Sequence, residues 1–220
     1  MRRMLFLLLL FPLVSNACNT IPLQSKKFVY FAQADKSHAS SFAITTKSGK
    51  TFILTNWHVC QDVQNRLIIK QPSSKPKVEY KLPIIGIDPA HDLCILPFKG
   101  EGLKLAKSYN IGERVAVLGH PNGVKEVVVS MGRILYKHDV NLNFPASPTV
   151  SYCIPQNRFT CSIRMNVVDT SAFGIPGSSG GPVINMDGEV IGIINNSIHE
   201  TKSGSMIPLE DIKRFLSKYE

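Results

Sequence analysis

Short runs of apolar residues recur along the chain between polar turns. Many are rich in valine, isoleucine and phenylalanine, and runs of this kind predict β-strands. Strands spaced by turns favour an all-β sandwich or barrel over an α/β fold. Near the end of the chain, Leu209, Ile212 and Phe215 recur on one helix face, which predicts a helix over residues 208–218. The strand predictions rest on residues 27–31, 41–45, 51–54, 66–70, 114–118, 127–129 and 190–194.

The first residues have the pattern of a secretory signal peptide. Two arginines precede the apolar stretch 5–14, and small residues follow it up to Ala17. The apolar stretch is short for a membrane span. We therefore expect removal of residues 1–17 and an exported protein that begins at Cys18. A cysteine there is also typical of bacterial lipoproteins, although Ser15 stands where their motif usually has leucine. The sequence leaves lipid attachment at Cys18 and simple secretion open, and with them a periplasmic, membrane-anchored or extracellular location.

The turn from Pro176 to Val183, PGSSGGPV, places two serine hydroxyls among residues without bulky side chains. A serine nucleophile needs backbone N–H groups directed at the developing oxyanion, and neighbouring glycines let the main chain approach a substrate closely. Turns of this composition are more often plain connections between strands. A catalytic interpretation therefore requires a general base elsewhere, with a carboxylate to orient it.

Two other segments supply these groups. His58 follows the apolar run 51–54 in TNWHVC, and Asp92 opens another run in HDLCIL. With Ser179 they occur in the order His, Asp, Ser, at intervals of 34 and 87 residues. The three segments resemble the motifs TAAHC, DIAL and GDSGGP of the chymotrypsin-like serine proteases. Further segments, such as LGHPNG and MDGEVIGI, are similar to the HtrA/Deg type of bacterial protease.

The resemblance implies two antiparallel β-barrels with the active site in the cleft between them. The protease domain would span residues 18–220, with the first barrel at about 24–105 and the second at about 110–200. HtrA-type proteins commonly continue into PDZ domains, and we expect a protease domain without them. No metal or cofactor is implied.

The resemblance also assigns roles to individual residues. Ser179 would be the nucleophile, His58 the general acid and base, and Asp92 the group that fixes the imidazole tautomer. The backbone N–H groups of Gly177 and Ser179 would form the oxyanion hole. Ser178 departs from the family, which usually has Asp or Asn before the nucleophile. That position does no proton chemistry, so we expect activity to be retained.

Each of the three residues also has a structural explanation, as a core histidine, a turn aspartate or a turn hydroxyl. Their joint occurrence in the family order favours the site. Asp88, which precedes a proline and is typical of a turn, and Asp62, in the polar stretch after the histidine, are rival carboxylates. The alternative histidines lie in polar or turn-like surroundings: His38, His120, His138 and His199.

Substrate preference rests on the family register alone. Phe173 lies six residues before the nucleophile, at the expected base of the primary specificity pocket, and Ile194 and Asn195 would form its wall. Phe173 argues against cleavage after lysine or arginine, so we expect small or aliphatic residues before the scissile bond. Residues 141–164 have no clear counterpart in the family, and we expect them either to cover the cleft or to lie on the second barrel.

Five cysteines are an odd number for an exported protein, in which thiols tend to pair. If Cys18 carries lipid, four remain. Cys153 and Cys161 flank a turn-rich stretch suited to a small disulfide loop. Cys60 and Cys94 each follow a proposed triad member by two residues, and either form a disulfide or serve as small buried hydrophobes. Four cysteines allow three pairings, so the connectivity stays open.

The formal net charge is +9, and without residues 1–17 the chain has 23 basic and 16 acidic residues, a net charge of +7. A basic exported protein can bind acidic envelopes, anionic lipid or nucleic acid. The lysines are scattered, which argues against nucleic acid. We therefore predict an exported serine endopeptidase that acts on protein or peptide substrates. A catalytically silent relative with a binding role and an esterase with the same triad are the alternatives.

Overall fold

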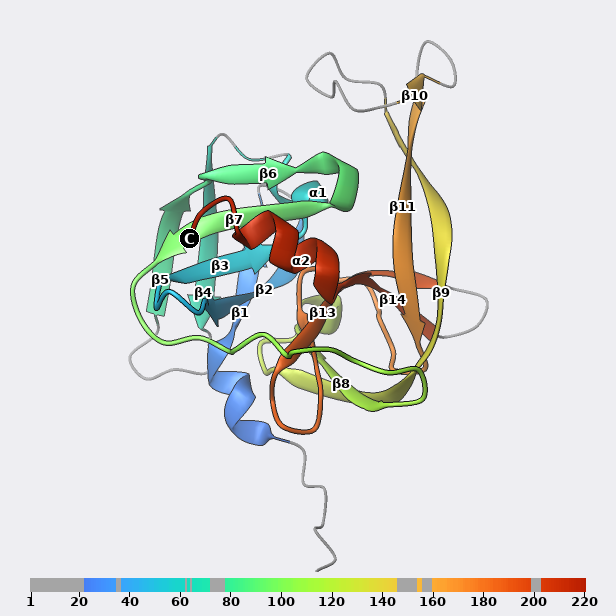
Figure 1. Ribbon diagram of the computed structural model, residues 1–220. Helices are drawn as coiled ribbons and strands as arrows, with labels where there is room; N and C mark the ends of the chain where they lie inside the picture. Colours follow the sequence, from blue (N-terminus) through green and yellow to red (C-terminus); the bar gives the residue numbers. More distant parts are fainter. Residues whose placement is uncertain are drawn as a thin grey trace, which may run out of the picture.

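The protein is built almost entirely from two β-sheets of seven strands each, as the computed structural model shows (Figure 1). The all-β prediction is confirmed. In the described part of the chain no helix is long and apolar enough to cross a membrane. The residues that the structure describes are 22–34, 37–61, 63, 65–71, 78–145, 154–155, 160–198 and 203–220.

The first sheet has the strand order β5-β4-β1-β2-β3-β7-β6, and it curls so that β5 contacts β7. Three short helical segments accompany it: η1 (Leu23–Phe28), α1 (Trp57–Cys60) and η2 (Pro89–His91). Its interior is filled mainly by isoleucine, leucine, alanine and cysteine at alternating strand positions, such as Leu67 and Ile69 or Cys94 and Leu96, as expected for strands buried on one face. Its strands are β1 (Val29–Gln33), β2 (His38–Thr45), β3 (Thr51–Thr55), β4 (Arg66–Gln71), β5 (Val78–Pro83), β6 (Gly86–Asp88) and β7 (Leu93–Phe98).

The second sheet has the order β10-β11-β14-β13-β12-β8-β9, and β9 also pairs with β11, which closes it into a barrel. The outer parts of β9 and β11 continue as a two-stranded ribbon that projects from the body (Figure 1). Residues 141–145 and 160–164 belong to this ribbon, and residues 154–155 pair with β11 beside it. The elements are β8 (Arg114–Gly119), η3 (Pro121–Gly123), β9 (Val128–Pro145), β10 (Ile154–Pro155), β11 (Thr160–Thr170), β12 (Pro182–Ile184), β13 (Val190–Ile198) and β14 (Ser203–Pro208).

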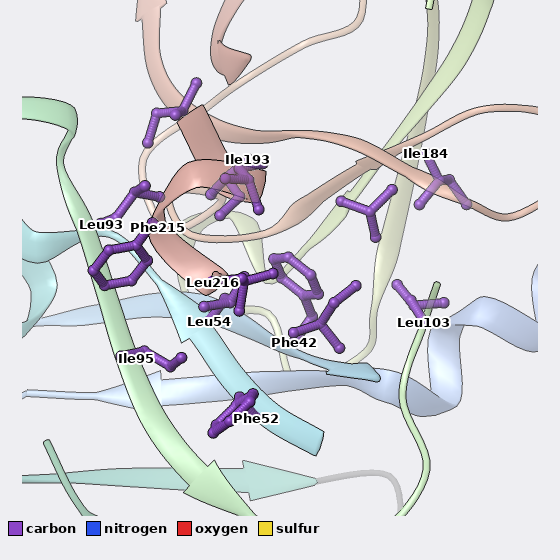
Figure 2. Close-up of a cluster of buried hydrophobic side chains, with 14 of the residues drawn as sticks. Phe42, Phe52, Leu54, Leu93, Ile95, Leu103, Ile184, Ile193, Phe215 and Leu216 are labelled. Atoms are coloured by element: carbon purple, nitrogen blue, oxygen red, sulfur yellow. The ribbon is translucent and has the colours of Figure 1, made fainter. Parts of the chain in front are cut away.

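The largest hydrophobic cluster contains side chains from both sheets and from the C-terminal helix α2 (Leu209–Leu216) (Figure 2). Leu209, Ile212 and Phe215 are all buried, as the helical spacing predicted. Burying a side chain of this size contributes about 1.5–3 kcal/mol, so this shared core strongly stabilises the arrangement of the two barrels. Its labelled members are Phe42, Phe52, Leu54, Leu93, Ile95, Leu103, Ile184, Ile193, Phe215 and Leu216.

The connection between the barrels pairs with both of them. Leu103 forms a parallel bridge with Ile44 of the first sheet, and Leu105 forms one with Val190 of the second. Leu103 is also part of the shared core. The connection is therefore packed against both barrels, and it helps to position the residues that face each other across the boundary.

Candidate active site

His58 and Asp92 are in direct contact. The His58 Nδ1 lies 2.7 Å from Asp92 Oδ2, and the His58 backbone N–H donates to Asp92 Oδ1 at 2.8 Å. The Asp92 side chain is 1% exposed and that of His58 is 32% exposed. Because a carboxylate only accepts hydrogen bonds, Nδ1 carries the proton and Nε2 is the unprotonated ring nitrogen. The imidazole therefore has the tautomer that a general base requires.

The backbone of Asp92 is held as firmly as its side chain. Asp92 follows η2 in the left-handed conformation, with φ of 50°, which aspartate adopts more readily than most residues. Its carbonyl accepts hydrogen bonds from the Trp57 N–H at 3.0 Å and from Asn56 Nδ2 at 3.1 Å. Asn56 is fully buried. This role of Asn56 could not be predicted from the sequence, because nothing in its local pattern indicates a contact 36 residues away.

The predicted nucleophile turn begins with the geometry of a type II turn. The Ser178 N–H donates to the Ile175 carbonyl at 2.9 Å, with Pro176 and Gly177 at the two central positions. Gly177 has φ of +91°, which the second central residue of this turn requires. A Cβ at Gly177 would lie 2.6 Å from the His120 carbonyl oxygen, so space as well as backbone conformation demands glycine.

Two backbone donors of this turn are unused. Within the described residues, neither the Gly177 N–H nor the Ser179 N–H donates a hydrogen bond to the protein. The Asn122 N–H donates to the Pro176 carbonyl at 2.7 Å. The peptide plane is fixed by this bond, and the Gly177 N–H points away from that carbonyl because the peptide is trans. The Ser179 hydroxyl donates to the Asn195 carbonyl at 3.0 Å.

Ser40 of β2 links the first barrel to this turn. Its hydroxyl donates to the Gly177 carbonyl at 2.8 Å and accepts from the His120 N–H at 2.8 Å. Its own N–H donates to the Ser179 carbonyl at 2.8 Å, and its carbonyl accepts from the Thr55 hydroxyl at 2.8 Å. Ser40 is fully buried. Sequence reasoning missed it, because one serine inside a strand has no local signal for a contact 137 residues away.

His120 is fully buried and lies next to Gly177 of the turn. Its Nδ1 is 3.0 Å from the Val124 carbonyl, so Nδ1 carries the proton. Its Nε2 is buried and has no hydrogen-bond partner among the described residues. Burial lowers the pKa of His120, and the hydrogen bond to Val124 only partly offsets this effect. His120 is therefore a neutral structural histidine beside the loop that carries Asn122.

The rival candidates make other contacts. Asp88 is bound to His91 at 3.1 Å. Burial alone would raise the pKa of Asp88, but the hydrogen bond from His91 and the charges of His91 and Lys218 lower it. His38 stacks on a phenylalanine ring, and His138 Nε2 lies 3.2 Å from a buried carboxylate of β11. Asp62 and His199 lie outside the described residues.

The assignment of Phe173, Ile194 and Asn195 to the specificity pocket stays a prediction. Phe173 is 50% exposed and lines a hollow of about 350 Å³ with Ile175 and Ser178, and the lining of this hollow includes neither Ile194 nor Asn195. Ile194 is buried, and its side chain lies beside two glycines. A Cβ at Gly174 would lie 3.0 Å from Ile194 Cγ1, and one at Gly204 would lie 2.7 Å from Ile194 Cδ1.

Cys60 and Cys94 form a disulfide that joins the end of α1 to β7. The bond connects the two segments that carry His58 and Asp92. Cys18 and Cys153 lie outside the described residues, and the side chain of Cys161 is not described. In the described part of the chain, no group of three or more His, Cys, Asp or Glu side chains is arranged to hold a metal ion.

Comparison with known proteins places this geometry in a family. The family model described as "Trypsin-like peptidase domain" matches residues 39–193, a range that includes His58, Asp92 and Ser179. The chain belongs to this family. Its sequence is 34% identical over 179 residues to the "Probable periplasmic serine endoprotease DegP-like" of Ectopseudomonas mendocina, covering 79% of this chain and 32% of that protein.

A second relative supports the HtrA/DegP relationship. The "Serine protease Do-like HtrB" of Bacillus subtilis is 29% identical over 176 residues, covering 76% of this chain and 35% of that protein. The chain thus spans about a third of the length of these curated relatives. It is a trypsin-like serine protease homologue of the HtrA/DegP type.

Solved structures with the same fold are more distant in sequence. The active form of the Rv3671c protease from M. tuberculosis superposes with a TM-score of 0.71 at 21% identity, covering 91% of this chain and 84% of that one. The MamO protease domain from Magnetospirillum magneticum gives a TM-score of 0.63 at 15% identity, covering 87% and 97%. These similarities establish the fold.

Proposed function

We propose that this protein is an exported serine endopeptidase that cleaves peptide bonds through an acyl-enzyme on Ser179. The observation that carries the proposal is the pair formed by His58 and Asp92 at 2.7 Å, together with the turn whose Gly177 and Ser179 N–H groups donate to none of the described residues. In this arrangement a base has the required tautomer and a nucleophile has donors beside it.

The proposed reaction begins when the Ser179 hydroxyl exchanges its acceptor. Rotation about its Cα–Cβ bond moves the proton from the Asn195 carbonyl toward His58 Nε2. The oxygen then forms a bond to the substrate carbonyl carbon while Nε2 takes the proton. The N–H groups of Gly177 and Ser179 stabilise the negative oxygen of the tetrahedral intermediate, an effect worth about 3–4 kcal/mol per donor in well-studied enzymes.

Breakdown of the intermediate completes the first half of the reaction. The His58 imidazolium gives its proton to the leaving amine as the carbon–nitrogen bond breaks, and the acyl group stays on Ser179. Water, deprotonated by His58, then attacks the ester and releases the second product. The buried Asp92 carboxylate stabilises the imidazolium in both halves, because removal of its charge would leave a cation without a partner.

For the substrate, we propose a preference for small or aliphatic residues before the scissile bond. Ile194 fills the space between Gly174 and Gly204, where a larger substrate side chain would need room. Position 173 has phenylalanine and therefore no carboxylate that could pair with a lysine or arginine side chain of the substrate. A library of fluorogenic peptides that differ only in the residue before the scissile bond tests the preference. Faster cleavage after arginine than after alanine or valine would contradict it.

Export is supported by the signal-like residues 1–17 and by relatives that are named periplasmic. The disulfide between Cys60 and Cys94 suits an oxidising compartment. Lipid attachment at Cys18 stays a proposal beside simple secretion. Mass spectrometry of the mature N-terminus distinguishes the two, because an unmodified Cys18 amine and thiol excludes lipidation.

The decisive test combines a fluorophosphonate probe with a casein digestion assay. We expect the wild type to be labelled and active, and Ser179→Ala to lose both properties. Ser178→Ala is the matched control, because Ser178 is the adjacent serine, and it should keep the label. An unlabelled and inactive wild type would support a silent relative, and a label that survives Ser179→Ala would mean another nucleophile.

A further inference from the structure

A cavity of about 710 Å³ lies where the two barrels, their connection and α2 meet. It is lined by the β2–β3 turn, the connection after Leu103, the turn before β13, and the last turns of the chain. Four lysines from three of these segments face it: Lys47, Lys104, Lys107 and Lys213. The residues that the proposed mechanism uses, His58, Asp92 and Ser179, are not part of its lining.

The four ammonium groups are not neutralised inside the protein. Within the described residues none of them forms an ion pair, whereas other lysines such as Lys70, Lys137 and Lys218 do. Lys213 Nζ donates to the Lys107 carbonyl at 2.7 Å, which holds one ammonium in place and leaves it two further N–H donors. Positive charges gathered around one concave surface raise the local potential and attract anions.

Two carboxylates also line the cavity, and they do not cancel the charge. Glu189 is already engaged, because the Asn185 side-chain amide donates to its Oε2 at 3.3 Å. Glu220 is exposed. Four cations against two anions leave an excess of two positive charges, which matches a multivalent anion better than a single carboxylate.

We propose that this cavity binds a phosphate-type anion with two or more negative charges, either a free diphosphate or phosphate groups of anionic lipid headgroups. Ammonium groups of lysine bind phosphate oxygens through charge-assisted hydrogen bonds. Leu105, Ala106 and Leu216 are apolar members of the lining, and a partly buried charge beside such side chains is screened less than one in open solvent. Because its walls come from both barrels, a bound anion also stabilises their junction.

Calorimetric titration of the full chain with inorganic pyrophosphate tests the site. We expect saturable binding that weakens with added salt, and a rise in the unfolding temperature with pyrophosphate. Lys104→Glu/Lys107→Glu should bind at least about tenfold more weakly, since each charge-assisted contact is worth roughly a factor of ten. Lys81→Glu/Lys125→Glu is the control, with the same change in net charge at exposed lysines outside the cavity.

Vesicles distinguish the two sources of phosphate. Flotation with phosphatidylglycerol vesicles, compared with phosphatidylcholine vesicles, shows whether lipid headgroups reach the cavity. Binding of pyrophosphate alone assigns a free anion, and binding of phosphatidylglycerol that Lys104→Glu/Lys107→Glu abolishes assigns a lipid headgroup. The proposal is overturned if neither ligand binds, or if the control variant loses as much affinity as the cavity variant. Lys47→Glu, on a separate turn, should weaken binding as well and guards against a local folding defect.

Discussion

The Ser40 hydroxyl donates a hydrogen bond to the Gly177 carbonyl across the boundary between the two barrels. Ser40 belongs to a strand of the first barrel, and Gly177 to the turn that precedes the proposed nucleophile in the second. The same hydroxyl accepts from the His120 N–H. The conformation of the proposed oxyanion hole therefore depends on a side chain of the opposite barrel.

Ser40→Ala should lower kcat with little change in KM. The substitution removes the bond to the Gly177 carbonyl and leaves the buried His120 N–H without an acceptor. We expect kcat to fall by about tenfold to a hundredfold, since loss of one oxyanion donor costs about that much or more. Ser41→Ala is the control, because the neighbouring Ser41 is equally buried and, among the described residues, its hydroxyl bonds only to the Tyr30 carbonyl. Equal kinetics for both variants would argue against this positioning effect.

Asp92→Asn should keep the fold and lose most of the activity. An amide at this position can present its NH₂ to His58 Nδ1 and so favour the wrong tautomer. We expect kcat to fall by about four orders of magnitude, as in related triads. Steady-state cleavage of a fluorogenic peptide measures the effect. The matched Asp88→Asn changes the rival carboxylate, which is bound to His91, and should remain close to the wild type in kcat.

Gly177→Ala should reduce both stability and activity. Its positive φ and the nearby His120 carbonyl, 2.6 Å from an added Cβ, force the turn to change. Gly112→Ala separates these two causes, because Gly112 has φ of +83° but open space around its Cβ. We expect a loss of about 1 kcal/mol in the free energy of unfolding for Gly112→Ala with normal activity. Similar activity in the two variants would mean that the turn tolerates a side chain.

Acid should weaken the fold through His120. Burial lowers the pKa of His120 in the folded state, so as the pH falls below about 6.5 the unfolded chain takes up the proton first. The stability contributed by neutral His120 is therefore complete above that pH and is lost as the pH falls through the folded-state pKa. Denaturant unfolding at pH values between 5 and 8 measures how the free energy of unfolding changes with pH. One proton can change it by at most about 1.4 kcal/mol per pH unit. His120→Gln should flatten the slope, because the group whose pKa is lowered by burial is then absent.

Loss of the disulfide should destabilise the first barrel. Cys60 and Cys94 are 34 residues apart in sequence, and closing a loop of this length stabilises the folded state by about 3–4 kcal/mol in the chain-entropy model. We expect Cys60→Ala/Cys94→Ala to lower the free energy of unfolding by that amount, which appears as unfolding at a lower urea concentration. Reduction of the wild type with dithiothreitol should reproduce the shift. A reductant effect of the same size in the double variant would mean that another disulfide is responsible.

The sequence predicted those features whose signal is local. Leu209, Ile212 and Phe215 defined the C-terminal helix through their spacing, and the apolar runs defined most strands. His58 and Asp92 were found because short motifs surround them, and the structure brings the two together. Their catalytic roles and that of Ser179 stay predictions.

Contacts that arise only from the tertiary fold were not predicted. Ser40 and Asn56 lie in strand-like and turn-like sequence, and their partners are 137 and 36 residues away. Phe173 received its place in the specificity pocket by counting back from the nucleophile, and that place stays a prediction. Its half-exposed side chain lines a hollow with Ile175 and Ser178. A count fixes a position along the chain but not the direction of a side chain.

Phe42 and Leu54 from one barrel, Ile193 from the other and Phe215 from the C-terminal helix meet in a single core (Figure 2). In a screen for inactive alleles, substitutions at these positions would be recovered beside those in the cleft, although none of these side chains belongs to the proposed catalytic groups. Selection for activity therefore also acts on the apolar contact surface between the halves, and neither half is free to drift in sequence without the other.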